Sequence, residues 1–157
     1  MKKTFFYSLI LMLSLSFMSF NCSNDNDELN NNSQQIAQIE SVAKSGTWRI
    51  TNFNDSGQDE TADFAGYTFS FNNDGTLVAT NGTNTVNGTW SITNDDSSDD
   101  DNSNDDIDFN ISFPVPETND FEDLNDDWDI VSASSTKIEL IDISGGNGGT
   151  DMLTFEK

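Results

Sequence analysis

Large apolar side chains alternate with polar ones from about residue 46 to the end of the chain. Over residues 47–51, for example, Trp48 and Ile50 are separated and flanked by polar residues. Strict alternation over five to seven residues is typical of a β-strand that buries one face. The predicted inward positions are Trp48, Ile50, Tyr67, Phe69, Phe71, Val86, Trp90, Ile92, Ile107, Phe109, Ile111, Phe113, Ile138, Leu140, Leu153 and Phe155.

Glycine-containing turns separate these alternating segments. The sequences "NNDG" (72–75) and "NGTN" (81–84) are typical of tight hairpins, and "GGNGG" (145–149) predicts a longer connection. Strands joined by such turns are antiparallel neighbours. Only "FEDLNDDW" (121–128) has the spacing of a short helical turn.

The predicted class is therefore all-β, an antiparallel up-and-down meander of about seven or eight strands over residues 45–157. A meander of this kind has two exposed edge strands, and closing into a barrel removes both. The sequence thus predicts one small β-barrel domain. An open sandwich would show the same alternation and is the alternative.

Residues 1–21 have the pattern of a secretory signal peptide. Lys2 and Lys3 precede an apolar run of about 17 residues. A membrane-spanning helix needs roughly 20 mostly apolar residues, whereas a basic start followed by a short apolar run is typical of a signal peptide. The only cysteine, Cys22, follows this run and resembles the acylated cysteine of bacterial lipoproteins. That resemblance implies a membrane partner through an N-terminal lipid; a soluble secreted protein and an uncleaved anchor are the alternatives.

Residues 22–44 are rich in Asn, Asp, Gln and Ser and contain few large apolar side chains. Such a segment buries too little apolar surface to offset the entropy lost on ordering. We expect a flexible polar tether, with a helical turn or two between Gln35 and Lys44. The acidic "NDNDE" after Cys22 resembles surface-export signals of Gram-negative lipoproteins, and the alternative is a solvated spacer. The expected location is the outer membrane with surface exposure; a periplasm-facing or secreted chain is the alternative.

Charge and residue usage exclude several function classes. The chain carries 28 acidic and 6 basic residues, no histidine, and a formal net charge of −22. Such a charge repels nucleic acid. Catalytic triads, Cys–His dyads and histidine zinc sites need residues that the chain lacks once Cys22 is acylated. A carboxylate pair remains formally available, but alternation directs Asp108, Glu139 and Glu156 away from the interior, so we expect no enzyme and no cofactor.

The acidic segment 94–106 invites a calcium site, because hard cations prefer several carboxylate oxygens on a flexible loop. The residues of this segment do not match the ligand spacing of an EF-hand loop, whether the loop is taken to begin at Asp99 or at Asp95. Starting at Asp99 places Asn104 at the required glycine and Asn110 at the required glutamate, and starting at Asp95 places Asp100 at the glycine. A block of like charges is usually a solvated loop, so we expect no metal site there.

An ordered set of short motifs is similar to the lipocalin-like domain family of small bacterial lipoproteins. The resemblance spans about residues 45–157, and it implies a small barrel that holds an apolar ligand. It also implies a basic residue over the first tryptophan, usually Arg in the family, for which this chain offers Lys137 and Lys157. The motifs are Gly46-Thr47-Trp48, "YTFSFNNDGTLV" (67–78), Gly88-Thr89-Trp90, Trp128-Asp129-Ile130 and "MLTFEK" (152–157).

The same resemblance assigns roles to the inward residues. Trp48 would plug one end of the barrel against Leu153 and Phe155. The aromatic stripe would line a pocket for a small apolar or amphipathic ligand, at Tyr67, Phe69, Phe71, Trp90 and Phe109. The alternative is a barrel filled by these same side chains, because eight-stranded barrels are just wide enough for either outcome. The protein would then be a non-enzymatic surface interaction or structural module. With either interior, we expect a monomeric domain.

Overall fold

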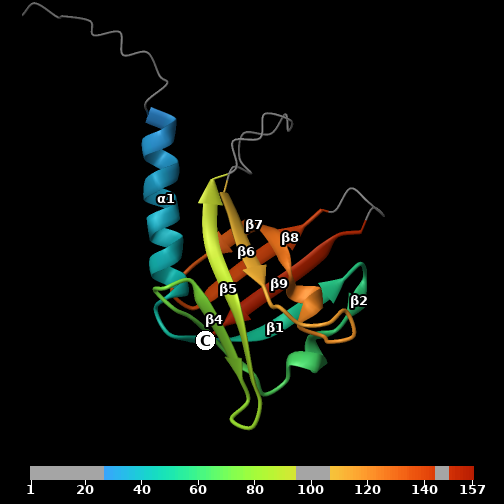
Figure 1. The fold of residues 1–157 in the computed structure, drawn as a ribbon. Coiled ribbons are helices and arrows are strands. Elements are labelled where there is room, and N and C mark those ends of the chain that lie inside the picture. The colour runs from blue at the N-terminus through green and yellow to red at the C-terminus, as the bar shows by residue number, and fades with distance from the viewer. Residues whose placement is uncertain (1–26, 95–106, 144–148) are drawn as a thin grey trace, which may run out of the picture.

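The computed structural model describes residues 27–94, 107–143 and 149–157, and these form one barrel with a helix packed on it (Figure 1). The strands follow one another around the barrel in the order β1-β3-β4-β5-β6-β7-β8-β9, and β9 returns to pair with β1. Every pairing is antiparallel, and β2 extends β1 as a small hairpin. The elements are α1 (Asp27–Ala43), β1 (Thr47–Asp55), β2 (Gln58–Asp59), η2 (Thr61–Phe64), β3 (Thr68–Phe71), β4 (Thr76–Thr80), β5 (Thr85–Asn94), β6 (Ile107–Ser112), η3 (Glu122–Leu124), β7 (Asp126–Ala133), β8 (Lys137–Asp142) and β9 (Asp151–Glu156).

The closed eight-stranded meander confirms the predicted fold class and excludes the open sandwich. Burial alternates along the strands as expected, with buried residues at every second position of β3, β4 and β6. Leu77 and Ala79 of β4 join the inward face, although the sequence pattern had not singled them out. Closure leaves β1 paired on both sides, so the meander has no long unpaired edge there.

Two glycines are required by the backbone path. Gly75 closes the β3–β4 turn with φ +81°, its N–H donates to the Asn72 carbonyl at 3.1 Å, and its own carbonyl accepts from Trp90 N–H at 2.9 Å. Gly88 lies in β5 where a Cβ would press against the Ser112 carbonyl oxygen and reach within 2.7 Å of the Phe113 ring. A side chain at residue 88 would therefore push β6 away from β5.

The segment expected to be a flexible tether contains a 17-residue helix, α1. The prediction of only a helical turn or two from Gln35 was wrong, because it relied on the polar composition of the segment and not on the spacing of its few apolar residues. Ile36, Ile39 and Ala43 recur at intervals of three and four residues, so they share one helical face. Ile39 and Ala43 are buried in the barrel core and Ile36 packs against it. Tertiary burial of this stripe therefore stabilises a helix whose remaining residues are polar.

The helix lies along the inward face of the last part of β5. Asn32 Nδ2 donates to Asn94 Oδ1 at 2.6 Å, and Lys44 Nζ lies 5.9 Å from the Trp90 ring centroid. Trp90 and Asn94 are four residues apart on one strand and therefore lie on the same face. Since Trp90 is a core residue, that face is the inward one, and α1 covers this end of the barrel (Figure 1).

The two short helical turns close the side of the barrel away from α1 (Figure 1). Phe64 of η2 and Phe121, which precedes η3, pack edge to face with ring centroids 5.4 Å apart. The turn η3 confirms the short helical turn expected within 121–128. Within the described ranges, no helix has both the length and the apolar character that crossing a membrane requires. The predicted signal peptide over 1–21, Cys22, most of the acidic segment 94–106 and most of the "GGNGG" connection lie outside the described residues.

Candidate functional site

Four of the five residues predicted to line a pocket lie in a packed aromatic cluster. Phe69 and Phe109 have no exposed surface, and Phe71 and Trp90 are buried. The ring centroid of Phe71 lies 5.3 Å from those of both Trp90 and Phe109, in edge-to-face arrangements. Aromatic rings at 4.5–7 Å are in favourable contact. These side chains therefore fill space inside the barrel, which supports the alternative of a filled interior.

Tyr67, the fifth of these residues, directly precedes β3 and is half-buried. Its ring packs edge to face on Phe121, with the centroids 5.0 Å apart. None of the three hollows described below is lined by Tyr67 or by the other four aromatic residues. A ligand role for these five positions stays a prediction.

The residues predicted to plug one end, Trp48, Leu153 and Phe155, are all fully buried. The Trp48 Nε1–H donates to the Ala43 carbonyl at 2.8 Å, and Ala43 is the last residue of α1. The final carbonyls of a helix lack partners within the helix, so this bond satisfies one of them. It also joins the helix to the first strand of the barrel.

Lys157 occupies the place that the family resemblance reserves for a basic residue. Its Nζ lies 4.5 Å from the Trp48 ring centroid and donates to Ser45 Oγ at 2.7 Å. Lys137, the other candidate, instead pairs with Glu139. The cation therefore holds together the end of β9, the turn after α1 and the start of β1, where the C-terminus is drawn in Figure 1.

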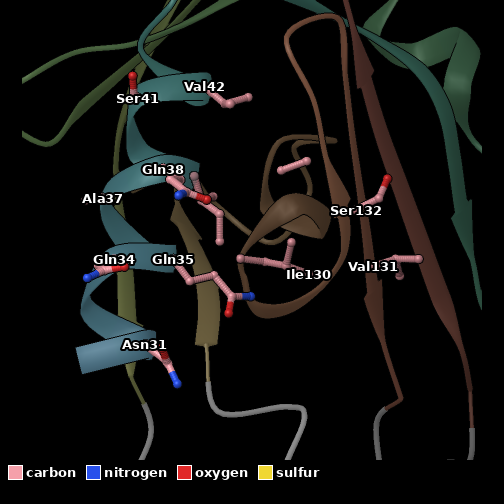
Figure 2. A pocket seen from close by; sticks show the side chains of 12 residues that line it. Asn31, Gln34, Gln35, Ala37, Gln38, Ser41, Val42, Ile130, Val131 and Ser132 are labelled. Atoms are coloured by element: carbon pink, nitrogen blue, oxygen red, sulfur yellow. The ribbon is translucent and has the colours of Figure 1, made fainter. Parts of the chain in front are cut away.

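A hollow of about 910 Å³ lies between α1 and β7. Gln35 and Val42 reach from α1 toward β7, and Ile130 reaches back toward α1 (Figure 2). We call this space the helix groove. It is lined by Asn31, Gln34, Gln35, Ala37, Gln38, Ile39, Ser41, Val42, Ile130, Val131, Ser132 and Ala133.

The helix groove lies beside the last residues of β7. In the described part of the chain, the β6–β7 ladder runs from the pair Asp108 and Asp129 to the pair Ile111 and Asp126. The β7–β8 register shifts between Ile130 and Ser132, so a bulge lies there. Bulges bend a strand and increase its twist. This irregular part of β7 forms one wall of the helix groove.

None of the described residues that line the helix groove carries a charge, although the whole chain has a net charge of −22. On the α1 wall, Asn31, Gln35, Gln38 and Val42 are spaced by four, three and four residues and so share one helical stripe. The opposite wall includes Ile130 and Ala133, which pair with the core residues Leu140 and Ile138. One wall thus offers carboxamides, and the other is mainly apolar.

Two smaller hollows adjoin Val131, which is 61% exposed. One, of about 460 Å³, lies over the outer faces of β1, β8 and β9 and includes Met152 and Lys137. The other, of about 180 Å³, is lined by residues that include Gln35 of α1, Ile107 of β6 and Asp129 of β7. The second hollow shares Gln35, Ile130 and Val131 with the helix groove and so extends it.

The three carboxylates considered from the sequence lie away from the barrel interior. Asp108, Glu139 and Glu156 alternate with core residues and face outward, as expected. Burial, followed by the neighbouring Asp127, raises the pKa of Asp126 to about 6. Among the described residues, no group of three or more metal-ligating side chains is placed to hold an ion.

Sequence reasoning did not find the helix groove, because its α1 wall was assigned to the tether. The stripe of Ile36, Ile39 and Ala43 would have indicated a helix beside the barrel. The carboxamide stripe of Asn31, Gln35 and Gln38 lies next to it at the same helical period. No local signal indicates the β7 side of the groove, because it depends on how α1 packs beside the end of β7.

Comparisons with known solved structures give a distant structural likeness. The chain matches no protein-family model, and no curated protein matches it. The fold is similar to a crystal structure of a DUF4847 family protein from Bacteroides vulgatus, with 18% sequence identity and a TM-score of 0.45. The match covers 75% of this chain and 96% of that protein.

Proposed function

We propose that this chain is a non-enzymatic, lipid-anchored binding module of the bacterial cell envelope, with its recognition site in the helix groove. The barrel serves as a rigid scaffold, and α1 and β7 present the groove at one end of it. The ligand is a small amphipathic molecule. In the proposed arrangement, acylated Cys22 holds the domain at the outer membrane of a Gram-negative cell, as in the lipocalin-like lipoproteins that the sequence resembles.

The observation that carries this proposal is the contrast between the interior and the groove. The interior side chains contact one another, with Phe71 held between Trp90 and Phe109. The groove, in contrast, is an open space of about 910 Å³. Binding sites for small molecules are commonly 300–1,000 Å³, largely apolar, and supplied with a few polar groups. The groove matches this description with Ile39, Val42 and Ile130 beside Gln35 and Gln38.

Binding of the neutral dye Nile red, whose fluorescence rises in apolar surroundings, tests the proposal. Val42→Asn makes the groove wall polar and is expected to weaken dye binding at least fivefold, roughly the effect of losing one buried apolar side-chain contact. Val78→Asn is the matched control, because Val78 is half-buried on the outward face of β4. The control is expected to bind dye like the wild type, and thermal melts of both variants separate binding from stability.

Two outcomes would contradict the proposal. Absence of dye binding by the wild type at high micromolar concentration would leave the barrel as a structural module. Equal binding by wild type and Val42→Asn, together with loss of binding on truncation of Phe109, would move the site to the barrel interior.

A further inference from the structure

We propose that the outer face of the barrel binds one molecule of a zwitterionic amphiphile, with a single aliphatic chain and a head group that carries both charges. The site is the hollow of about 460 Å³ over β7, β8, β9 and β1, which we call the outer hollow. These four strands are successive neighbours in the barrel (Figure 1). The outer hollow touches the helix groove only at Val131, so this inference goes beyond the proposed function.

Two β-bulges flank the outer hollow at one level of the sheet. The bulge in β7 adds Val131 opposite Glu139 of β8. The bulge in β1 adds Thr51 opposite Thr154 of β9. Glu139 and Thr154 pair with each other, so the two bulges lie on either side of the same step of the β8–β9 ladder. Both extra residues line the outer hollow. Bulges re-aim side chains and are over-represented next to active sites, and here two of them converge on one hollow.

One end of the outer hollow is apolar. Ile141 of β8 and Met152 of β9 form a cross-strand pair, and they face outward because each is next in sequence to a core residue. Met152 is 46% exposed, and the exposed Val131 lies beside this pair on β7. Exposed apolar side chains that gather on one face mark interaction sites, unlike those scattered singly. This end therefore offers contact to an aliphatic chain.

The other end of the outer hollow is charged but locally neutral. Lys137 of β8 pairs with Glu156 of β9, and Glu156 pairs on its other side with Arg49 of β1. Lys137 Nζ also donates to Glu139 Oε1 at 2.5 Å. An ammonium group has three N–H donors, so the bond to Glu139 uses only one of them. These four side chains, two basic and two acidic, sum to zero charge.

The two ends together define the class of ligand. A head group with one sign of charge would meet a like charge for each opposite charge at the neutral end, and the net charge of −22 further disfavours an anion. A zwitterionic head group can place its acidic group on Lys137 and its ammonium group on Glu156. These side chains are directly opposite, with Cβ atoms about 5 Å apart. The apolar pair lies four residues farther along β8, roughly 13 Å away, where the aliphatic chain would lie.

Binding of dodecylphosphocholine below its critical micelle concentration tests this inference. The protein is the mature chain, residues 22–157 with Cys22→Ala, which contains every element that the structure describes. Met152 is the only methionine in these residues, so NMR of methyl-labelled methionine gives one signal from the outer hollow. A saturable shift of this signal is expected. Dodecyl sulfate, dodecyltrimethylammonium and dodecyl maltoside carry the same chain and are expected to bind at least fivefold more weakly.

Variants at the charged end test the contacts with the head group. Lys137→Gln and Glu156→Gln are each expected to weaken binding of dodecylphosphocholine at least fivefold, because each removes a charge-assisted hydrogen bond. Lys44→Gln is the matched control. Lys44 also forms a salt bridge with a glutamate, Glu40, but it lies on α1 and does not line the outer hollow. The control is expected to bind like the wild type.

A variant at the apolar end tests the contact with the aliphatic chain. Ile141→Asn is expected to weaken binding of all four amphiphiles at least fivefold, since the chain loses an apolar partner. Nile red binding in the helix groove is expected to be unchanged in Ile141→Asn and in Glu156→Gln, so the two sites succeed or fail separately. Thermal melts of each variant separate binding from stability.

Three results would overturn the inference. Absence of a saturable shift of Met152 at every concentration below micelle formation would refute the outer hollow as a binding site, whatever Nile red does in the helix groove. Equal affinity for the four amphiphiles would refute the zwitterionic head group. Wild-type affinity in both Lys137→Gln and Glu156→Gln would refute the charged contacts on which the choice of ligand rests.

Discussion

Replacement of Trp48 tests how the helix, the first strand and the end of the chain are joined. Trp48 has no exposed surface. Its Nε1–H donates to the Ala43 carbonyl at 2.8 Å, and Lys157 Nζ lies 4.5 Å from its ring centroid. Trp48→Leu therefore removes ring packing, one hydrogen bond and one cation–π contact. Trp48→Phe removes the hydrogen bond and only part of the packing.

The expected losses differ between the two variants. Truncation of a buried aromatic side chain typically costs about 3–5 kcal/mol of the free energy of unfolding, and we expect Trp48→Leu to lie near the lower end because leucine refills part of the space. For Trp48→Phe we expect about 1–3 kcal/mol, mainly from the lost hydrogen bond and the unpartnered Ala43 carbonyl. Domains of this size are stable by only about 5–15 kcal/mol, so Trp48→Leu removes a large share.

The contribution of Lys157 is isolated by a double-mutant cycle between Trp48→Leu and Lys157→Met. Lys157 is exposed, so its cation–π contact with Trp48 is expected to contribute about 0.5–1 kcal/mol of coupling. Replacement of Lys157 by methionine keeps an apolar side chain over the Trp48 ring. The coupling energy therefore measures the contribution of the charge rather than that of packing.

Urea unfolding followed by circular dichroism measures all of these changes, because it does not depend on tryptophan fluorescence. With a slope of about 2 kcal/mol per molar urea, a loss of 3 kcal/mol lowers the midpoint by about 1.5 M. A loss below about 1 kcal/mol for Trp48→Leu would refute the plug role of Trp48. A coupling energy indistinguishable from zero would refute the contact with Lys157.

Three further predictions concern other parts of the molecule. Gly88→Ala places a methyl group against the Ser112 carbonyl oxygen, so it is expected to cost at least about 1–3 kcal/mol; an unchanged melting temperature would contradict this. Because the pKa of Asp126 is raised to about 6, the folded state binds its proton more tightly than the unfolded state, and stability is lost as pH rises from about 4 through 6. Asp126→Asn is expected to raise the melting temperature at pH 7 and to flatten this dependence, and an unchanged pH profile would show that another group is responsible. Cys22→Ala is expected to abolish incorporation of a labelled fatty acid in growing cells, and equal labelling of both proteins would exclude acylation at Cys22.

Much of the barrel follows from local sequence. A strand with one buried face must alternate apolar and polar residues, and Phe69, Phe71, Phe109 and Ile111 do so without interruption. Short turns with glycine at positive φ, such as Gly75, force antiparallel neighbours. Alternation and turns together therefore determined both the meander and its inward residues, because each depends only on residues near in sequence.

Helix α1 could not be predicted from local sequence alone. The polar composition of residues 27–43 does not favour an isolated helix, and only contact with the barrel buries Ile39 and Ala43. Most helical stability in proteins comes from such tertiary packing. The apolar spacing was visible in the sequence, but the surface that makes it stabilising was not.

The candidate site was decided by tertiary structure alone. Aromatic residues on an inward stripe either fill a barrel or line a cavity, and the result depends on how rings from different strands meet, as Phe71 of β3 meets Trp90 of β5 and Phe109 of β6. The helix groove depends on the bulge in β7 and on how α1 packs beside the end of that strand. Alternation determines which face of a strand is buried, whereas the distance between two strands is set by the packing of the whole barrel.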